Sequence, residues 1–426
     1  MLNSLRLRLT HYLSRIIVGD MLVFFVIATG SQIIFAFYAI RSVLYIPLIE
    51  ALGVNHAEFG ALMSLTGLGV LFSGLLAFVQ KLLSVRFLLT AGLTVNGVGA
   101  VLISVTHDIT VLYIIFALMG FVGMGVYWPS VLSAVRCLTA PQCQGQGFSL
   151  LELMRRITEL VMNGLCVALF VLIGNLYGIR TIAFILGVVM LISAAMHWRL
   201  LRFTHHSIAS NKSRKESIQL MLQAAKMKEV WLVGFMALGV YVCYVGMQYF
   251  LPFINQVYDV SVVNGALFAL VNVSVIGIIA ATFSGFLADN VFRSPTRFLV
   301  FILIITLSLL GLLLIVPHHA SWFLVVITVA IVFTFAVYLA RSIYFAPIGE
   351  FNISPDLTGC AMAIAAFIGY SPMFFAYSIF GSVIDNFEHN TAYNLIFTIM
   401  FGFALLSTLC GVLLLVLKRK NARTFL

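Results

Sequence analysis

Long apolar runs recur from one end of this chain to the other, separated by short polar breaks. Most runs reach about 20 residues, which at about 1.5 Å per residue crosses about 30 Å of hydrocarbon. The runs are continuously apolar, whereas barrel strands would alternate in polarity over about 10 residues. The pattern predicts an all-α polytopic membrane protein with about 12 transmembrane helices. We expect them at residues 22–46, 57–79, 86–105, 109–134, 147–173, 178–200, 229–255, 262–288, 297–316, 320–345, 356–384 and 391–417.

The polar segments between these runs divide the chain into five predicted parts. The first carries three arginines and is expected to lie along the cytoplasmic membrane surface as an amphipathic segment, with no cleavable signal peptide. The parts are the cytoplasmic amphipathic N-terminal segment 1–21, an N-terminal six-helix bundle 22–200, a basic cytoplasmic linker 201–228, a C-terminal six-helix bundle 229–417 and a basic cytoplasmic tail 418–426.

Composition excludes a water-soluble domain, and the placement of charge orients the chain. Hydrophobic residues make up 62% and charged residues 9%, against about 25% charged in an average soluble domain. The net charge is +10, but the basic residues gather in the breaks that fall on one side of the predicted bundle. This is the distribution of cytoplasmic loops, so both termini are expected in the cytoplasm and the charge is not read as a nucleic-acid site. A bacterial inner membrane is the expected location.

The two halves of the chain match each other. Residues 73–77 read Ser-Gly-Leu-Leu-Ala and residues 284–288 read Ser-Gly-Phe-Leu-Ala, an offset of 211. A second match, Pro47 with Pro252, has an offset of 205, so one half has gained residues in its second span. Two six-helix bundles related by pseudo-symmetry are the plan on which many transporters place a substrate site.

The segment from Gly285 to Arg293, Gly-Phe-Leu-Ala-Asp-Asn-Val-Phe-Arg, resembles the cytoplasmic loop signature of the major facilitator superfamily. The resemblance implies the two-bundle fold of that family and a cytoplasmic gate formed by Gly285, Asp289 and Arg293. In the equivalent loop of the first half, Phe78 stands where the aspartate should be, so the resemblance implies a latch in the second half only.

Within that superfamily the chain is most similar to the organophosphate and nitrate/nitrite branch, especially its YihN-like members. The similar stretches are residues 37–41, 146–155 and 340–346. Organophosphate antiporters bind phosphate through one arginine on span 1 and another on span 7. Arg41 matches the first and Tyr244 occupies the place of the second, so the resemblance implies an anion site without implying a phosphate ester.

Charged residues inside the predicted spans are the best candidates for function, because a charge at mid-membrane costs about 2.5–3.5 kcal/mol on insertion scales and normally faces a cavity or a partner. Span 1 carries Arg41 next to Tyr38. In span 5 the helical repeat places Glu152, Arg156 and Glu159 on one face with Arg155 beside it. Two interpretations stay open: an internal ion network, or arginines that line the cavity while Glu152 or Glu159 takes a coupling proton.

The second half offers one more charge inside a span and a polar aromatic stripe. Arg341 lies in span 10, three residues from Tyr344, and is either a substrate contact or a side chain that extends to the membrane surface. Tyr241, Tyr244 and Gln248 share one face of span 7. These three side chains serve either in helix packing or in substrate binding.

These observations predict a secondary active transporter for a small or medium organic anion that works by alternating access and is driven by a proton or counter-anion gradient. The alternatives are an exporter of a siderophore- or drug-like amphipathic compound and a transport-inactive membrane sensor on the same fold. The cysteine and histidine spacings match no metal site and no ATP-binding loop is present, so no metal, no cofactor and no enzymatic activity is expected. The expected partners are the substrate, the coupling ion and the lipid bilayer, and we expect a monomer.

Overall fold

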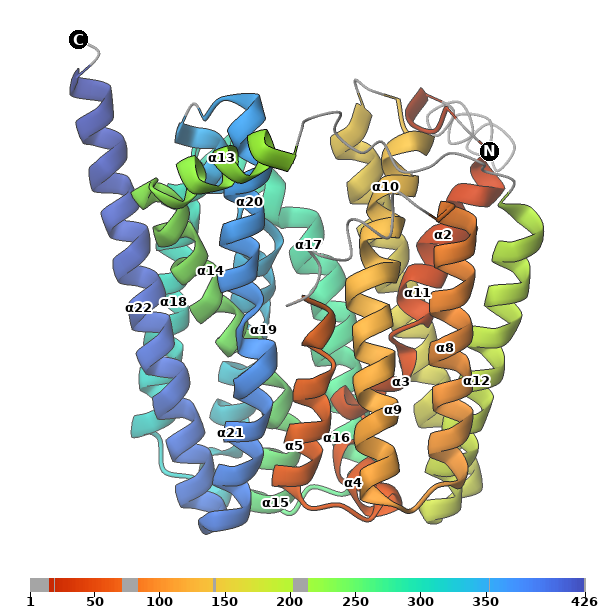
Figure 1. Ribbon diagram of the computed structural model, residues 1–426. Helices are drawn as coiled ribbons and strands as arrows, with labels where there is room; N and C mark the ends of the chain where they lie inside the picture. Colours follow the sequence, from red (N-terminus) through yellow and green to blue (C-terminus); the bar gives the residue numbers. More distant parts are fainter. Residues whose placement is uncertain are drawn as a thin grey trace, which may run out of the picture. The chain divides into compact units, whose positions relative to one another are not determined.

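The computed structural model describes residues 15–18, 20–70, 83–140, 143–201, 214–351 and 353–424 (Figure 1). These residues are helical apart from loops and one isolated bridge between Ile17 and Thr139, which confirms the all-α prediction. Among them, 10 helices are long and apolar enough to cross a membrane, or 11 if one bent pair is a single span. The second expected span lies outside the described residues from residue 71 on, as do the loop residues 73–78, most of the segment 1–21 and residues 202–213 of the linker.

The chain forms two compact units. The first contains Met1–Gly53 and Leu65–Ser210, and the second contains Val54–Ser64 and Asn211–Leu426. A short segment that precedes the linker in sequence, Val54–Ser64, therefore belongs to the second unit.

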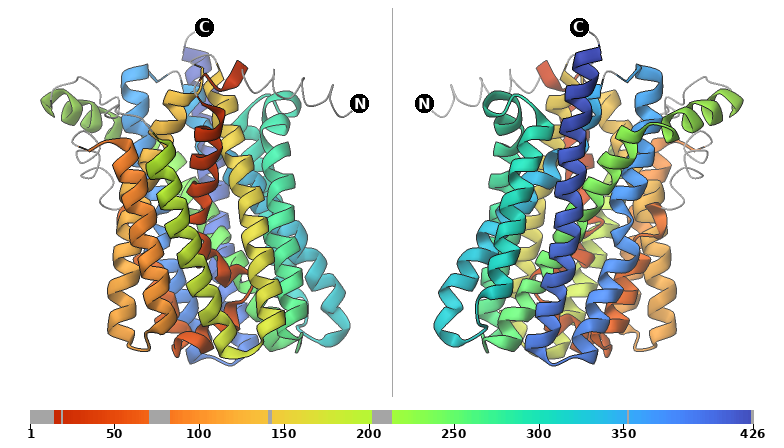
Figure 2. Two further views of the ribbon diagram at one scale, coloured as in Figure 1. Left: turned by 90° about the vertical axis from the view of Figure 1, so that its right-hand side faces the viewer. Right: turned by 90° about the vertical axis from the view of Figure 1, so that its left-hand side faces the viewer.

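The first unit is built from helices that correspond to the expected spans 1 and 3 to 6. Within it α12 runs along α8, and α2 packs on α11 and α12 (Figures 1 and 2). Its helices are α2 (Met21–Ile33), α3 (Ala36–Ala39), η1 (Ile40–Ser42), α4 (Tyr45–Leu52), α8 (Val85–Val105), α9 (Ile109–Val122), η2 (Gly123–Tyr127), α10 (Trp128–Leu138), α11 (Gln144–Ile173) and α12 (Asn175–Leu200).

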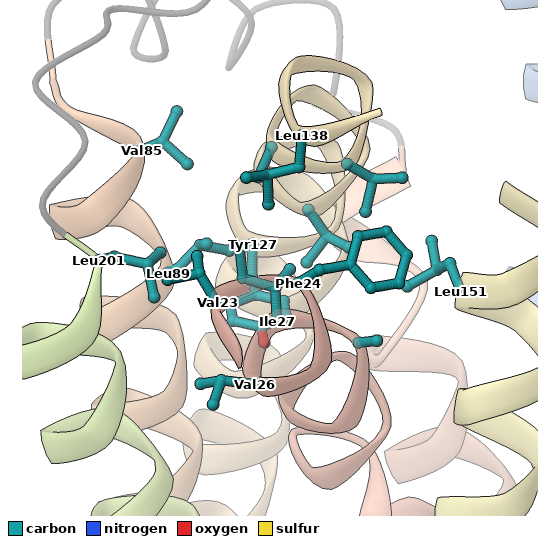
Figure 3. Packing of buried hydrophobic residues seen from close by; sticks show 14 of the residues in the cluster. Val23, Phe24, Val26, Ile27, Val85, Leu89, Tyr127, Leu138, Leu151 and Leu201 are labelled. Atoms are coloured by element: carbon teal, nitrogen blue, oxygen red, sulfur yellow. The ribbon is translucent and has the colours of Figure 1, made fainter. Parts of the chain in front are cut away.

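A cluster of buried apolar side chains joins these helices near the start of α2 (Figure 3). Phe24 and Ile27 from α2, Leu89 from α8 and Tyr127 from η2 are all fully buried within it. Because lipid tails are as apolar as the protein interior, such a cluster stabilises a membrane bundle through close packing more than through exclusion of water.

Span 1 is broken, although the sequence predicted one continuous helix. α2 ends at Ile33, and the following stretch Ala36–Ser42 is bent by 48° from it. The hydroxyls of Thr29 and Ser31 donate to carbonyl oxygens of the preceding turn, Phe25 O at 2.8 Å and Ala28 O at 2.6 Å. Such back-bonding weakens and bends helices, and the apolar pattern alone did not reveal it.

The second unit contains the remaining helices. Within it α14 packs against α20 and α22, and α18 packs against α19 and α22. Its helices are α5 (His56–Leu65, which belongs to this unit through Ser64), α13 (Arg214–Ala225), α14 (Lys228–Gly246), η4 (Met247–Tyr249), α15 (Phe250–Val257), α16 (Val262–Ala269), η5 (Leu270–Val275), α17 (Ile276–Phe286), η6 (Leu287–Val291), α18 (Pro295–Ile315), η7 (Ala320–Trp322), α19 (Phe323–Ile343), η8 (Ala346–Phe351), α20 (Pro355–Tyr370), α21 (Pro372–Asn386) and α22 (His389–Thr424).

Span 7 is also interrupted. The 3-10 helix η4 separates α14 from α15, just as η1 interrupts span 1 of the first unit. The two interruptions contain Gln248 and Arg41, and each lies a few residues before the matched prolines Pro252 and Pro47. Discontinuous helices are common where transporters bind substrates and ions, because the interruption frees backbone polar groups.

Candidate functional site

The charged residues of span 5 form a continuous ion-pair ladder along α11. Glu152 Oε2 lies 2.9 Å from Arg155 Nη1, and Glu152 Oε1 lies 2.9 Å from Arg156 Nη2. Arg156 Nη1 then reaches Glu159 Oε2 at 2.8 Å. The ladder matches each guanidinium with a carboxylate on the same helix, so its formal charge sums to zero.

Burial differs strongly along this ladder. The side chains of Arg156 and Glu159 are 8% and 10% exposed, whereas Glu152 is 37% exposed. Removing one member of a buried ion pair leaves an uncompensated charge, which is far more costly than removing an exposed one. Glu152 is therefore the member whose charge can change at least cost.

Arg155 connects the ladder to the break in span 1. Its Nη2 donates to Gln32 Oε1 at 3.2 Å, in the last turn of α2, and its guanidinium carbon lies 4.6 Å from the centre of the Trp128 ring. Its Nε is buried and has no hydrogen-bond partner within the described residues. Gln32 and Trp128 were not among the predicted site residues. Trp128 starts α10 directly after the π-helical turn η2, an irregularity that the apolar run conceals.

Arg41 lies in η1 and donates from Nη1 to the backbone oxygen of Tyr38 at 3.0 Å. The Tyr38 side chain is buried, and its ring packs edge-on against Phe37 and Phe116. The described contacts therefore place Tyr38 in an aromatic cluster. A substrate role for Arg41 and Tyr38 stays a prediction.

In the second unit, Arg341 is surrounded by tyrosine rings. Its guanidinium carbon lies 4.0 Å from the centre of the Tyr244 ring and 6.0 Å from that of Tyr241. Both distances are within the range of cation–π attraction. The helix that carries Arg341, α19, contains no aspartate or glutamate.

More tyrosines extend this cluster. Tyr241 packs edge-on against Tyr244 and Tyr370, with both centroid distances 5.4 Å, and Tyr344 lies 6.5 Å from Tyr370. The structure thus brings the predicted residues Tyr241, Tyr244, Arg341 and Tyr344 together, and it adds Tyr370. We call this set the tyrosine cage: Tyr241, Tyr244, Arg341, Tyr344 and Tyr370.

Gln248 forms a hydrogen bond with a tyrosine of α21 (Pro372–Asn386). Its amide nitrogen donates to the hydroxyl of Tyr377 at 3.5 Å, and it is 7% exposed. The Tyr377 backbone oxygen also accepts a hydrogen bond from the hydroxyl of Tyr249 at 3.3 Å. Of the three residues that the spacing of span 7 places on one face, Tyr241 and Tyr244 are in ring contact. The spacing could not show that Tyr370 contacts Tyr241 or that Tyr377 contacts Gln248, because both lie more than 100 residues later.

The loop signature, residues 285–293, ends span 8 in a backbone turn. Asp289 lies in the π-helical turn η6, and Arg293 adopts φ 52°, the left-handed region that is uncommon for residues other than glycine. The N–H of Ser294 donates to Ala288 O at 3.1 Å, which ties the chain after Arg293 back to the end of this helix. A gating role for Gly285, Asp289 and Arg293 stays a prediction.

Beyond the spans, Glu350 in η8 forms an ion pair with Lys418, 2.8 Å from Oε1 to Nζ, and accepts a hydrogen bond from Thr296. Burial raises the pKa of Glu350, but the hydrogen bonds from Lys418 and Thr296 outweigh burial, and the net shift is downward. The basic segment expected as a tail continues α22 as far as Thr424.

Arg180, near the start of α12, connects helix ends of the first unit. Its two terminal nitrogens donate to Ala51 O at 2.8 Å, Ser104 O at 3.3 Å and Thr106 O at 3.2 Å. A cation at helix C-termini is favourable because unpaired carbonyls gather there.

No group of three or more histidine, cysteine, aspartate or glutamate residues in the described part of the chain could hold a metal ion.

Comparisons with known proteins agree with this architecture. The family model described as Major Facilitator Superfamily matches residues 21–377. The Escherichia coli inner membrane protein YihN is 26% identical over 88% of this chain and 90% of its own length, and the inner membrane protein YqcE of the same organism is 21% identical over 86% and 88%.

Solved transporters share the fold at low sequence identity. A mutant of the nucleoside transporter NupG superposes with a TM-score of 0.72 at 12% identity, covering 92% of this chain and 99% of that one. A bacterial homologue of the human lysosomal transporter Spinster superposes with a TM-score of 0.70 at 13% identity, covering 94% and 98%.

Proposed function

Because this chain belongs to the major facilitator superfamily, we propose that it is a secondary active transporter that moves a small or medium organic anion across the bacterial inner membrane. It works by alternating access and is driven by a proton or counter-anion gradient. The names of its relatives YihN and YqcE support the inner-membrane location.

The observation that carries the anion assignment is the environment of Arg341. Its guanidinium lies over the faces of Tyr244 and Tyr241, and its helix carries no carboxylate. Aromatic faces attract a cation without cancelling its formal charge. A guanidinium held in this way keeps the charge that attracts a carboxylate, phosphate or sulfonate group.

The first unit contributes a charge-balanced set. Arg155 already contacts Glu152, Gln32 and Trp128, so an arriving anion competes with Glu152 for this arginine. A carboxylate that loses its arginine takes up a proton more readily. Glu152, the exposed member of the ladder, is thus the proposed coupling group, with Glu159 as the buried partner that keeps Arg156 in place. Arg41, by its match to the span-1 arginine of anion antiporters, is a further proposed contact.

A thermal-shift screen of the purified protein tests this function. The panel pairs organic anions with neutral isosteres, for example a carboxylate with its amide and a phosphate ester with its methyl ester. We expect at least one anion to raise Tm where its neutral partner does not, and Arg341→Gln to abolish the shift. Arg419→Gln, which changes a basic residue near the end of α22, serves as the matched control and keeps the shift.

The two rival functions predict different results. An exporter of amphipathic compounds would be stabilised by large neutral or cationic molecules and would keep that response in Arg341→Gln. A sensor would bind an anion yet fail to exchange it across proteoliposome membranes. Either result would overturn the transporter of small anions proposed above.

A further inference from the structure

Two fully buried side chains of the first unit each leave one polar atom without a hydrogen-bond partner among the described residues. His197 lies in the last turn of α12 and Tyr127 ends η2, and both side chains are 0% exposed. The unpartnered atoms are His197 Nε2 and the Tyr127 hydroxyl oxygen. A buried polar atom without a partner costs about 1–3 kcal/mol. Two such atoms in one bundle therefore point to a further group that completes them.

Both atoms face Gly30 of α2. A Cβ atom on Gly30 would lie 2.8 Å from His197 Nε2 and 3.1 Å from the Tyr127 hydroxyl oxygen, so these two atoms lie within about 6 Å of each other. One water molecule that forms two ordinary hydrogen bonds spans such a separation. Figure 3 shows Tyr127 within the buried cluster, where the other labelled side chains are apolar.

The two atoms also have complementary chemistry. His197 Nδ1 donates to the backbone oxygen of Ser193 at 2.8 Å. A carbonyl oxygen can only accept, so Nδ1 carries the hydrogen and Nε2 of the neutral ring presents a lone pair. The Tyr127 hydroxyl both donates and accepts. The bond to Ser193 thus aims a proton acceptor at the side of the ring where the tyrosine lies.

The described contacts place two arginines around this pair. Arg155 acts electrostatically on Tyr127, and Arg86 stacks on the ring of Trp198, the residue after His197, at 4.1 Å. Within the described residues no carboxylate bonds to either member of the pair. A positive charge on His197 is therefore opposed by its surroundings, and an anion that neutralises Arg155 would relieve part of that opposition.

We propose that His197 Nε2 and the Tyr127 hydroxyl, joined by one buried water, form a proton-binding site of the first unit, and that a proton bound there strengthens anion binding at Arg155. This inference rests on the function proposed above, in which Arg155 meets the anion. It is separate from Glu152, because the two groups lie on different helices.

The protonation step changes one bond. A proton from solvent forms an N–H bond at Nε2 and adds one positive charge, while Nδ1 keeps its hydrogen bond to Ser193. The water then accepts from Nε2 and donates to the Tyr127 oxygen, which reverses the direction of both bonds. Because binding linkage is reciprocal, a proton that strengthens anion binding is itself bound more strongly when the anion is present.

Nitrogen NMR of the intact protein labelled with ¹⁵N-histidine tests the pair without any substrate. The His197 signal is the one that disappears in His197→Gln. At pH 8 it should show the Nδ1–H form with transfer of magnetisation from water, and its Nε2 shift should move in Tyr127→Phe. Tyr393→Phe is the matched control, since Tyr393 is also fully buried but bonds to Gln256 in the second unit. An Nε2 shift unchanged in Tyr127→Phe, or a ring without water transfer, would overturn the proposed site.

Calorimetry in a Glu152→Gln background tests the effect on the anion. The probe is a panel anion whose own charge is constant between pH 8 and pH 5. We expect its Kd to be about fivefold lower at pH 5 than at pH 8, within the usual range of coupling between two sites. Adding His197→Gln should remove this difference, because the amide can still bond to Tyr127 but cannot take up a proton. Adding His319→Gln, which changes an exposed loop histidine, should leave it unchanged.

The two parts of the proposal and the proposed function fail in different ways. A Kd that stays pH-dependent after His197→Gln, in a variant whose Tm shows normal folding, would overturn the link to the anion. If His197→Gln unfolds, Tyr127→Phe in the same background replaces it and should also reduce the pH dependence. A screen in which no anion binds would overturn the proposed function, while the NMR measurement still decides whether His197 and Tyr127 form a pair.

Discussion

The arginines of span 5 are matched by glutamates on their own helix, whereas Arg341 in span 10 rests on tyrosine rings. The first arrangement is neutral as a set and largely buried. The second combines one arginine with neutral aromatic rings. The difference suggests a division of labour in which the second unit supplies charge for an anion and the first supplies a carboxylate that can change protonation.

The largest expected effect is on stability in the first unit. Arg156→Ala should leave Glu159 as a buried unpaired carboxylate and lower the free energy of unfolding by about 3–5 kcal/mol. Expression and Tm in detergent measure this loss. The double variant Arg156→Gln with Glu159→Gln should recover most of it, because two amides can bond to each other. A double variant as unstable as Arg156→Ala would show that the stability of the ladder does not depend on the Arg156–Glu159 pair alone.

Arg341 should behave in the opposite way. Arg341→Gln should fold with a Tm close to that of the unmodified protein, yet weaken binding of the panel anion about 100-fold, or about 2.7 kcal/mol. Arg341→Lys should recover only part of the affinity, because an ammonium cannot reproduce the two parallel donors of the guanidinium. Titration calorimetry with the best anion of the screen measures both. Normal anion affinity in Arg341→Gln would show that the anion binds outside the tyrosine cage.

Glu152→Gln separates coupling from binding. Glu152 is the exposed member of the ladder, so the Glu152→Gln protein should fold normally. It should exchange labelled anion for unlabelled anion at a rate within about threefold of normal. It should lose accumulation driven by a pH gradient, because no proton can be taken up or released there. Proteoliposome flux with and without the gradient measures the two activities. Gradient-driven accumulation by Glu152→Gln would reassign coupling to Glu159 or to another group.

The aromatic support of Arg341 should have a smaller effect. Tyr244→Leu removes the ring 4.0 Å from the guanidinium and should weaken anion binding by about 1 kcal/mol, roughly fivefold. Tyr244→Phe keeps the ring and should bind nearly normally. If the two variants are equally impaired, the hydroxyl of Tyr244, not its ring, is the part that matters.

The sequence predicted much of this comparison because helical spacing is local. The positions of the four span 5 charges follow from 3.6 residues per turn, and the structure pairs them along one helix. Likewise the stripe of Tyr241 and Tyr244 follows from their spacing. The substrate roles of these residues stay predictions.

What the sequence could not predict depends on contacts between distant helices or on breaks within an apolar run. Tyr370 joins Tyr241 across more than 100 residues, and the break near Gln32 follows two hydroxyls that bond back to the helix. Asp385 is the clearest case. Local spacing does not pair Asp385 with α5, and only its hydrogen bonds from the backbone N–H groups of His56 and Ala57 reveal that it caps this helix.

The second unit also contains an ion pair with a glutamate, Glu350–Lys418. We expect it to contribute less to stability than the buried ion pair of span 5. Lys418, the partner of Glu350, is 36% exposed, so water and salt screen the attraction and Glu350→Gln should cost only about 0.5–1 kcal/mol at pH 7. The pKa of folded Glu350 is lowered from its ordinary value of 4.5, because hydrogen bonds from Lys418 and Thr296 outweigh the effect of burial.

The pH dependence of this pair follows from the direction of that shift. A carboxyl with a lowered pKa stabilises the folded state fully above its unfolded value of about 4.5 and loses this contribution as pH falls through the folded value. The Tm difference between Glu350→Gln and the unmodified protein should therefore be constant from pH 8 to about pH 5.5 and shrink below pH 4.5. Adding about 0.5 M salt should also reduce it, whereas the Arg156→Ala defect should hardly respond, because a buried pair is screened much less. An equal salt response in both variants would mean that water reaches the Arg156–Glu159 pair, and the contrast between a buried ion pair and one whose lysine is exposed would then fail.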